Sequence, residues 1–262
     1  DHQDIEELME MFGIFEKNRR YFIVNRGHPL TRRFSRDEKM DFSADPDAPA
    51  GVMAEGFRHD GLSIRFTIGH TGFEIRALGR HNMENALAAV AVAVQLGIPL
   101  ATCAVALSHY TGIYRRHQVY GVKNGVWLVD DYAHNPVKCA AAIAACQPMA
   151  SKLVAWFQPH GYKPTKFLRD EFVKEISAVL RPQDEIWMSE IYYAGGTATK
   201  DISAHDLVND ILKLGKPAYF VEDRKDLLEA LRPHLSGDCV LLLMGARDPS
   251  LESFARSVWE AL

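Results

Sequence analysis

The second half of the chain alternates short apolar runs with stretches of helical periodicity. The apolar runs are five or six residues long and rich in β-branched and aromatic side chains, which is typical of buried strands. They lie at 126–131, 152–157, 185–189, 217–221 and 239–244. Helical patterns follow at 136–147, 166–180, 203–214, 224–234 and 249–261. This alternation predicts a doubly wound α/β domain with a parallel sheet covered on both faces, because crossover helices lie over parallel strands.

The first half has a different pattern. Residues 51–58, 61–68 and 71–77 alternate around the turn sequences HDG and GHTG, which predicts antiparallel strands joined by tight turns. Helical patterns lie at 3–18, 82–96 and 100–109, a further strand is predicted at 20–25, and the polar stretch 31–50 is predicted to be irregular. We place the domain boundary near Thr111 and Gly112, which divides the chain into domains 1–111 and 112–262.

Composition and charge narrow the class of protein. The 262 residues are 47% hydrophobic, enough for two globular domains. The net charge is −4, and lysines and arginines are dispersed, so neither a nucleic acid nor an anionic membrane is expected as a partner. No apolar run has the ~18 residues of a membrane span, and no signal peptide is present, so we predict a cytoplasmic protein. Because the chain starts without Met in helix-like sequence, we expect it to be the later part of a longer protein.

The four cysteines, Cys103, Cys139, Cys146 and Cys239, lie in apolar or helical contexts. They include no C-x-x-C pair. This usage favours buried, reduced thiols over a metal site or disulfide bonds.

Polar residues follow the strand predicted at 126–131. Asp130, Asp131 and His134 lie at the end of this strand, and a helix begins near Pro136. The free N–H groups of the first helical turn are therefore expected to face the same side as Asp131 and His134. Ligands of parallel sheets bind at the carboxyl ends of the strands. A carboxylate there can accept hydrogen bonds from ribose hydroxyls, and an imidazole can meet a phosphate. Alternatively, the carboxylates cap the helix and His134 is an ordinary packed polar residue.

Three more polar loops follow predicted strands. The first, 156–165, contains Gln158, His160 and Tyr162, and the others are 189–201 and 244–250. Each loop alone is compatible with an ordinary solvated surface. If the sheet is parallel, all of them lie on the same edge as Asp131, which favours a shared ligand site.

Two further pairs of residues could bind a nucleotide. Asn82 and Asn85 are one turn apart at the start of the helix predicted at 82–96, and amides can meet both donors and acceptors of an adenine edge. Helix capping is the alternative for this pair. Arg115 and Arg116 follow the domain boundary and can reach a phosphate, although surface arginines are common.

These segments, in this order, resemble the Mur ligases of peptidoglycan synthesis, most closely their alanine-adding members. The resemblance covers nearly the whole chain. It is carried by DH at 1–2, GRHNMENALAA at 79–89, GIYRRH at 112–117, VDDYAHNP at 129–136, FQPHGY at 157–162, EIYYAGG at 190–196 and LLLMGA at 241–246. It implies that 1–111 is an incomplete part of the central ATP-binding α/β domain. It also implies that 112–262 is the C-terminal Rossmann-like domain.

The resemblance further implies an activity and its residues. Members of this family use ATP and Mg²⁺ to join an amino acid to the carboxylate of a UDP-N-acetylmuramate-type sugar, through an acyl phosphate. By this resemblance His2 binds the metal, Asn82 and Asn85 meet adenine, Arg116 meets a phosphate, and Asp131 meets the ribose. His134, His160 and Tyr162 would then form the catalytic, amino-acid side of the site.

The sequence also departs from the family pattern. It contains no G-x-x-G-K-[S/T] segment, so the phosphate-binding loop is absent and this chain alone is expected to be inactive. Gly161 and Pro164 stand where alanine-adding members have arginines, and Gly196 replaces an acidic residue. The amino acid and the carboxylate substrate therefore stay open, as does the oligomeric state. The alternatives are a Mur-like ligase outside peptidoglycan synthesis and a non-catalytic nucleotide-binding module.

Overall fold

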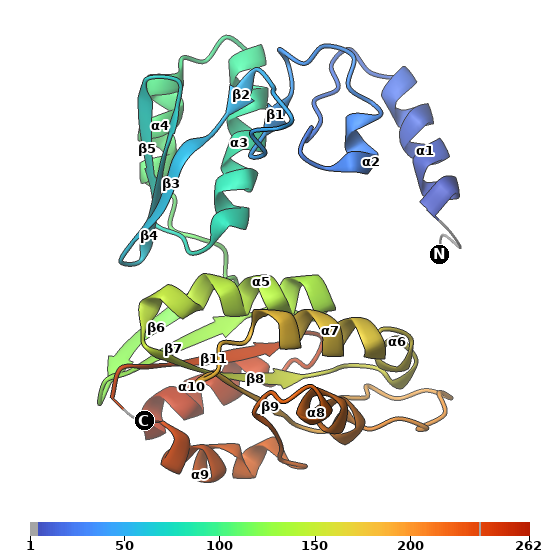
Figure 1. Cartoon of the computed structure of the whole chain (residues 1–262), viewed down its shortest axis with the longest axis vertical. Coiled ribbons are helices and arrows are strands. Elements are labelled where there is room, and N and C mark those ends of the chain that lie inside the picture. The colour runs from blue at the N-terminus through green and yellow to red at the C-terminus, as the bar shows by residue number, and fades with distance from the viewer. Residues whose placement is uncertain (1–4, 236) are drawn as a thin grey trace. The chain divides into compact units, whose positions relative to one another are not determined.

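The computed structural model describes residues 5–235 and 237–262 (Figure 1). The chain divides into two compact units, with the boundary between Thr111 and Gly112. Each unit has its own cluster of buried hydrophobic side chains.

The second unit is built on a six-stranded sheet with the strand order β10-β9-β8-β11-β7-β6. Its strands are β6 (Gln118–Lys123), β7 (Val126–Asp131), β8 (Lys152–Gln158), β9 (Glu185–Met188), β10 (Ala218–Phe220) and β11 (Cys239–Gly245). The strands from β10 to β7 pair in parallel, and β6 pairs antiparallel with β7. The predicted doubly wound, mostly parallel α/β sheet is therefore confirmed.

The edge strand β6 was not predicted. Its apolar positions do not form a continuous run, and the pairing with β7 shifts register between Val119 and Gly121. Gly121 has φ of 142°, and an added Cβ would lie 2.9 Å from the Trp259 ring. Because the Trp259 ring lies so close, only glycine fits at position 121. A β-branched residue, which would have indicated a strand in the sequence, is therefore absent there.

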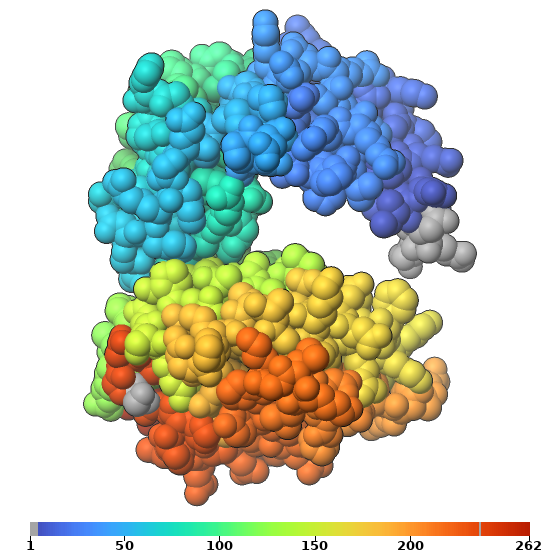
Figure 2. Space-filling model, in the orientation of Figure 1, coloured from blue at the N-terminus to red at the C-terminus, as the bar shows by residue number. Residues whose placement is uncertain are grey.

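Helices cover both faces of this sheet. They are α5 (Pro136–Cys146), α6 (Tyr162–Phe167), α7 (Arg169–Val179), α8 (Ala204–Lys213), α9 (Leu227–Leu231) and α10 (Leu251–Ala261). Helices α5 and α7 lie on one face, and α9 and α10 lie on the other (Figure 1). Residues with the colours of α5, α7 and α8 are visible on the face of this unit drawn in Figure 2. Every residue of the central strand β11 is buried between these layers, which explains its uninterrupted apolar sequence.

Two predicted helices of this unit are shorter than expected. The segment predicted at 166–180 is divided into α6 and α7, which meet at Leu168. The segment predicted at 224–234 contains the short helix α9 between two 3-10 turns, η2 (Arg224–Asp226) and η3 (Arg232–His234). Pro233 lies in the second of these turns, where its missing N–H ends the α-helical ladder.

The first unit contains a short parallel strand pair, an antiparallel meander and four helices in its described part. Its elements are α1 (Ile5–Lys17), α2 (Pro29–Arg32), β1 (Phe42–Ser43), β2 (Val52–Met53), β3 (Glu55–Asp60), β4 (Ser63–Ile68), β5 (Thr71–Ile75), α3 (Arg80–Gln95) and α4 (Leu100–Ser108). The predicted antiparallel strands correspond to the meander β3-β4-β5, except that β2, at the start of the strand predicted at 51–58, is separate and pairs parallel with β1. Phe66 and Phe73 stack in its core, with ring centroids 5.3 Å apart.

The strand predicted at 20–25 is wrong. Only Asn25 pairs, in an isolated parallel bridge with Phe42. The N–H of Val24 instead donates to the Asp41 carboxylate, at 3.0 Å. A side chain thus supplies the partner that a neighbouring strand would have supplied, and the segment stays irregular.

The prediction of buried thiols is confirmed for Cys103, Cys139, Cys146 and Cys239. Burial raises the pKa of the Cys139 and Cys146 thiols, and it raises the pKa of Cys239 to about 11. Among the described residues, no helix is long and apolar enough to cross a membrane.

Candidate active site

Asp130 forms a buried ion pair at the end of β7. Its carboxylate accepts hydrogen bonds from Arg115 Nε at 2.9 Å and from Arg115 Nη2 at 3.3 Å. Arg115 Nη2 also donates to the Gly245 carbonyl at 3.0 Å, which connects β7 to the end of β11. Burial raises the pKa of the Asp130 carboxyl, and the hydrogen bond from Arg115 acts in the opposite direction. The pair is therefore a structural connection between the start of the second unit and its sheet.

Asp131, the next residue, contacts His117. Its Oδ2 accepts a hydrogen bond from the His117 backbone N–H at 2.7 Å and lies 3.1 Å from His117 Nδ1. Its Oδ1 accepts from the Ala133 N–H at 2.7 Å. Burial lowers the pKa of the His117 ring, although the Asp131 charge opposes this. The carboxylate is 3% exposed, and it holds two loop segments together.

The short segment between these two pairs has an unusual backbone. Arg115 and His117 have φ of 53° and 47°, a left-handed form that costs an L-residue on the order of 1 kcal/mol. Arg116 lies between them and is exposed. Its guanidinium carbon is 5.3 Å from the centroid of the Tyr132 ring. The guanidinium carbon of Arg115 is also 5.4 Å from this centroid. The two arginines differ in that Arg115 is buried and paired with Asp130, whereas Arg116 is exposed and can meet a ligand.

His134 lies beside Tyr132 in the loop between β7 and α5. The two rings have centroids 5.6 Å apart. His134 Nδ1 is 2.9 Å from the Tyr132 carbonyl oxygen, and because a carbonyl only accepts, Nδ1 carries a proton. In the neutral ring Nε2 is then an acceptor. The helix that follows is capped by Asn135, whose Oδ1 accepts from the Lys138 N–H at 2.9 Å.

His160 meets His134 from the end of β8. Their ring centroids are 5.6 Å apart. Burial lowers the pKa of His160, and the nearby His134 and Arg247 lower it further. Its Nδ1 is buried and has no hydrogen-bond partner within residues 5–235 and 237–262. His160 is thus a neutral imidazole near neutral pH, and it faces a second imidazole.

Replacing His160 with glutamine is expected to reduce the loss of stability at mildly acidic pH. An unfolded histidine titrates near about 6.5, whereas the folded pKa of His160 lies lower. Between these two values the unfolded chain binds more protons, so the free energy of unfolding falls as pH decreases through this window. Urea unfolding between about pH 5 and pH 8 measures this slope. His70 is exposed, so His70→Gln is the matched control, and its stability should depend on pH as that of the wild type does. If the stability of His160→Gln also has the slope of the wild type, the assignment of His160 is wrong.

Tyr162 connects two of the predicted loops. It begins α6, is 8% exposed, and its ring centroid is 5.4 Å from that of Tyr193. Lys200 Nζ lies 5.8 Å from the centroids of both rings. The loops are also joined through the backbone, because the Gly161 N–H donates to the Tyr192 carbonyl at 2.9 Å. Lys166, in the same helix as Tyr162, forms an ion pair with Asp201.

A polar network connects the ends of the other strands. Arg224 Nη1 donates to Gln158 Oε1 at 2.9 Å and forms an ion pair with Asp248. Gln158 Nε2 in turn donates to the Glu190 carbonyl at 3.3 Å. These contacts join the loops after β8, β9, β10 and β11. The prediction that the polar loops share one edge of the sheet is thereby confirmed, and Asp248 belongs to the predicted loop 244–250, although the sequence did not indicate Arg224 or His117 as members of this edge.

Asn82 and Asn85 belong to the first unit. Both lie in the first turns of α3, away from its buried residues Met83 and Leu87. Asn82 Nδ2 donates to the Leu78 carbonyl at 2.7 Å, and Asn85 is exposed. The helix begins after Gly79 without a side-chain cap, so the alternative of helix capping by these amides is not what the structure shows.

His2 lies outside the described residues. Within the described part of the chain, no group of three or more His, Cys, Asp or Glu side chains is arranged to hold a metal ion.

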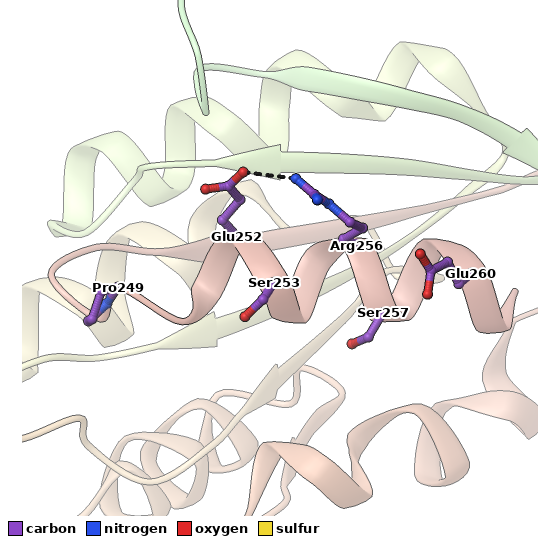
Figure 3. A pocket seen from close by; sticks show the side chains of 6 residues that line it. All are labelled: Pro249, Glu252, Ser253, Arg256, Ser257 and Glu260. Carbon is purple, nitrogen blue, oxygen red and sulfur yellow. Dashed lines mark hydrogen bonds and ion pairs between the residues drawn. The ribbon is translucent and has the colours of Figure 1, made fainter.

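A surface hollow of about 310 Å³ lies elsewhere on the second unit, along α10 (Figure 3). It is lined by Pro249, Glu252, Ser253, Arg256, Ser257 and Glu260. Glu252 and Arg256 form an ion pair there, at 3.1 Å. None of the predicted site residues lines this hollow.

Comparisons with known proteins identify the family. The family described as "Mur ligase, glutamate ligase domain" matches residues 115–247. The UDP-N-acetylmuramate--L-alanine ligase of Geobacter sp. (strain M21) is 34% identical over 207 residues, which are 76% of this chain and 44% of that protein. The chain thus spans about half the length of the curated relatives it matches. It covers 44% of the Geobacter protein and 46% of the UDP-N-acetylmuramate--L-alanine ligase of Acidithiobacillus ferrooxidans (strain ATCC 53993 / BNL-5-31).

Solved structures have the same fold. The UDP-N-acetylmuramate-alanine ligase MurC from Thermotoga maritima superposes with a TM-score of 0.76 at 22% identity, over 99% of this chain and 55% of that one. A MurF ligase from Thermotoga maritima, solved in complex with ADP, superposes with a TM-score of 0.59 at 15% identity, over 85% and 49%. Because the family match covers more than half of the sequence, this chain belongs to the Mur ligase family.

Proposed function

We propose that this chain is the C-terminal part of an ATP-dependent amide ligase. The full-length enzyme would join an amino acid to a UDP-N-acetylmuramate-type carboxylate through an acyl phosphate, in the cytoplasm. Residues 1–111 would be part of the central ATP-binding domain and 112–262 the C-terminal domain. The observation that carries this proposal is the convergence of Arg116, His134 and His160 at one edge of a Mur ligase sheet.

The residues of this edge fit a nucleotide. Arg116 is exposed, and no carboxylate of the described residues pairs with its guanidinium, so it is available to a phosphate. Asp131 accepts two contacts on Oδ2 and one on Oδ1. Since a carboxylate has about four acceptor sites, one remains for a ribose hydroxyl. Asn82 and Asn85 are proposed to meet adenine.

The imidazoles suit the amine side of the reaction. An amino group must lose a proton to attack an acyl phosphate, and a neutral imidazole can accept it. His160 is neutral near neutral pH because burial lowers its pKa, and His134 presents Nε2 as an acceptor in its neutral form. Tyr162 would line the same space with Tyr193.

The proposed cofactors are ATP and Mg²⁺. When bound, Mg²⁺ would neutralise charge on the transferring phosphoryl group. Its proposed ligand is His2, which lies outside the described residues.

An amino-acid-dependent phosphate-release assay on the full-length protein tests the proposal. With ATP, Mg²⁺ and UDP-N-acetylmuramate, we expect release with one or a few members of an amino-acid panel. Release that needs a different carboxylate would favour a Mur-like ligase outside peptidoglycan synthesis. Nucleotide binding without any turnover would favour a non-catalytic module.

The amino acid is left open by the chemistry of the loops. Gly161 and Pro164 supply no guanidinium, and Lys166 is paired with Asp201. Lys200, held against two tyrosine rings, is a cation without a carboxylate partner among the described residues. The panel should therefore include neutral and acidic amino acids.

A further inference from the structure

We propose that His117 is a positioning residue for Arg116. Through its two contacts to Asp131 it holds the segment 115–117 in the backbone form that presents the Arg116 guanidinium beside Tyr132. The inference rests on the proposed function, because the ligand of Arg116 is taken to be a nucleotide phosphate.

The geometry of the segment supports this role of His117. Arg115 and His117 both turn inward, with side chains 9% and 8% exposed, and each is bound to one of the tandem carboxylates. Arg116 is exposed between them. The alternation of inward and outward side chains fixes the direction in which Arg116 leaves the backbone.

The backbone conformation of the segment needs contacts that hold it in place. Both flanking residues are left-handed, with φ of 53° and 47°. An L-residue stays in this region only where its surroundings enforce it. Here the enforcing contacts are the Arg115–Asp130 pair and the His117–Asp131 contacts. Without the ring contact, only the backbone N–H of His117 still binds Asp131, and the segment is less restrained, which would let Arg116 turn away.

The same contacts reduce the negative charge behind Arg116. Two carboxylates directly behind a phosphate-binding arginine would repel the phosphate if their charge were uncompensated. Asp130 is compensated by Arg115, and Asp131 by the donors of His117 and Ala133. The inward residues thus both orient Arg116 and reduce the negative field behind it.

Glycine and asparagine variants of His117 in the full-length protein test the inference. Glycine adopts left-handed angles freely and keeps the backbone N–H contact to Asp131, so His117→Gly is expected to fold and to lose only the ring contact to Asp131. Asparagine tolerates the left-handed region and keeps an N–H donor for Asp131. The matched control is Asn124→Gly in the β6–β7 turn, where Asn124 is left-handed with φ of 52°.

The readouts are the dissociation constant of ADP by calorimetry and the steady-state KM values for ATP and for the amino acid. In His117→Gly we expect the ADP dissociation constant and the KM for ATP to rise about tenfold. The KM for the amino acid should change less than about threefold. His117→Asn should restore most of the affinity, and Asn124→Gly should leave it unchanged.

Arg116→Ala separates the two levels of the proposal. If Arg116→Ala weakens ADP binding but His117→Gly does not, His117 is not a positioning residue and the proposed function stands. If Arg116→Ala leaves ADP binding unchanged, the phosphate-binding role of Arg116 is wrong, and this inference fails with it. Equal losses of affinity for ATP and the amino acid in His117→Gly would indicate a merely structural residue and would also overturn the inference.

Discussion

Asp131→Ala is expected to reduce kcat/KM of the full-length ligase by roughly 100-fold or more. The substitution removes the acceptor proposed for the ribose. It also releases His117 and leaves the buried Ala133 N–H without its partner. A misplacement of about 1 Å in a reacting site can cost on the order of 100-fold in rate. Phosphate release at varied ATP measures the effect.

The effect of Asp131→Ala must be distinguished from unfolding. An unsatisfied buried N–H costs about 1–3 kcal/mol, so the variant should remain folded but less stable, which urea unfolding measures. Asp238→Ala is the matched control. Asp238 accepts from the Ser151 N–H at 3.0 Å just before β11, at the opposite edge of the sheet. Turnover in Asp131→Ala equal to that of Asp238→Ala would rule out the proposed role.

Asp130→Ala is expected to lower the free energy of unfolding by about 3–5 kcal/mol. The side chain of Arg115 is 9% exposed, and without its partner it would be a buried charge paired only with the Gly245 carbonyl. The urea midpoint of the variant measures the loss.

The exposed pair Arg256–Glu252 is the control for this prediction. Arg256→Ala should cost about 0.5 kcal/mol or less, since a solvated ion pair contributes little. The double variant Arg115→Met with Asp130→Leu should recover part of the loss, because the destabilisation comes mainly from the unpaired charge. If Asp130→Ala is no less stable than Arg256→Ala, the pair does not have the structural role assigned to it.

Much of the second unit was predictable because its sheet is parallel. Strands buried on both faces have continuous apolar sequences, as in β8 and β11, where the local composition alone is sufficient. The location of the polar loops followed from the same fact, because parallel strands end on one edge. His134 and His160 were therefore expected near each other, and their rings are 5.6 Å apart.

The errors have a common physical cause. Residues 20–25 have a strand pattern, but the Val24 N–H pairs with a side chain that is distant in sequence. The edge strand β6 lacks a continuous apolar run, and its glycine is required by Trp259, again a distant residue. In both cases the residue that determines the local structure is distant in the sequence. The periodicity of a short segment carries no information about such a residue.

The sequence by itself determined the apolar strands, the helices between them, the polar edge and the family resemblance, because each depends on local pattern or on short motifs. Only the tertiary structure decided the roles within the motifs. Arg115 and Arg116 have the same chemistry, as do Asp130 and Asp131. Folding pairs Arg115 with Asp130 in the interior and leaves Arg116 exposed against Tyr132. Such pairings depend on which side chains come close to each other after the chain has folded. Distances between residues in the folded protein cannot be read from their order in the sequence.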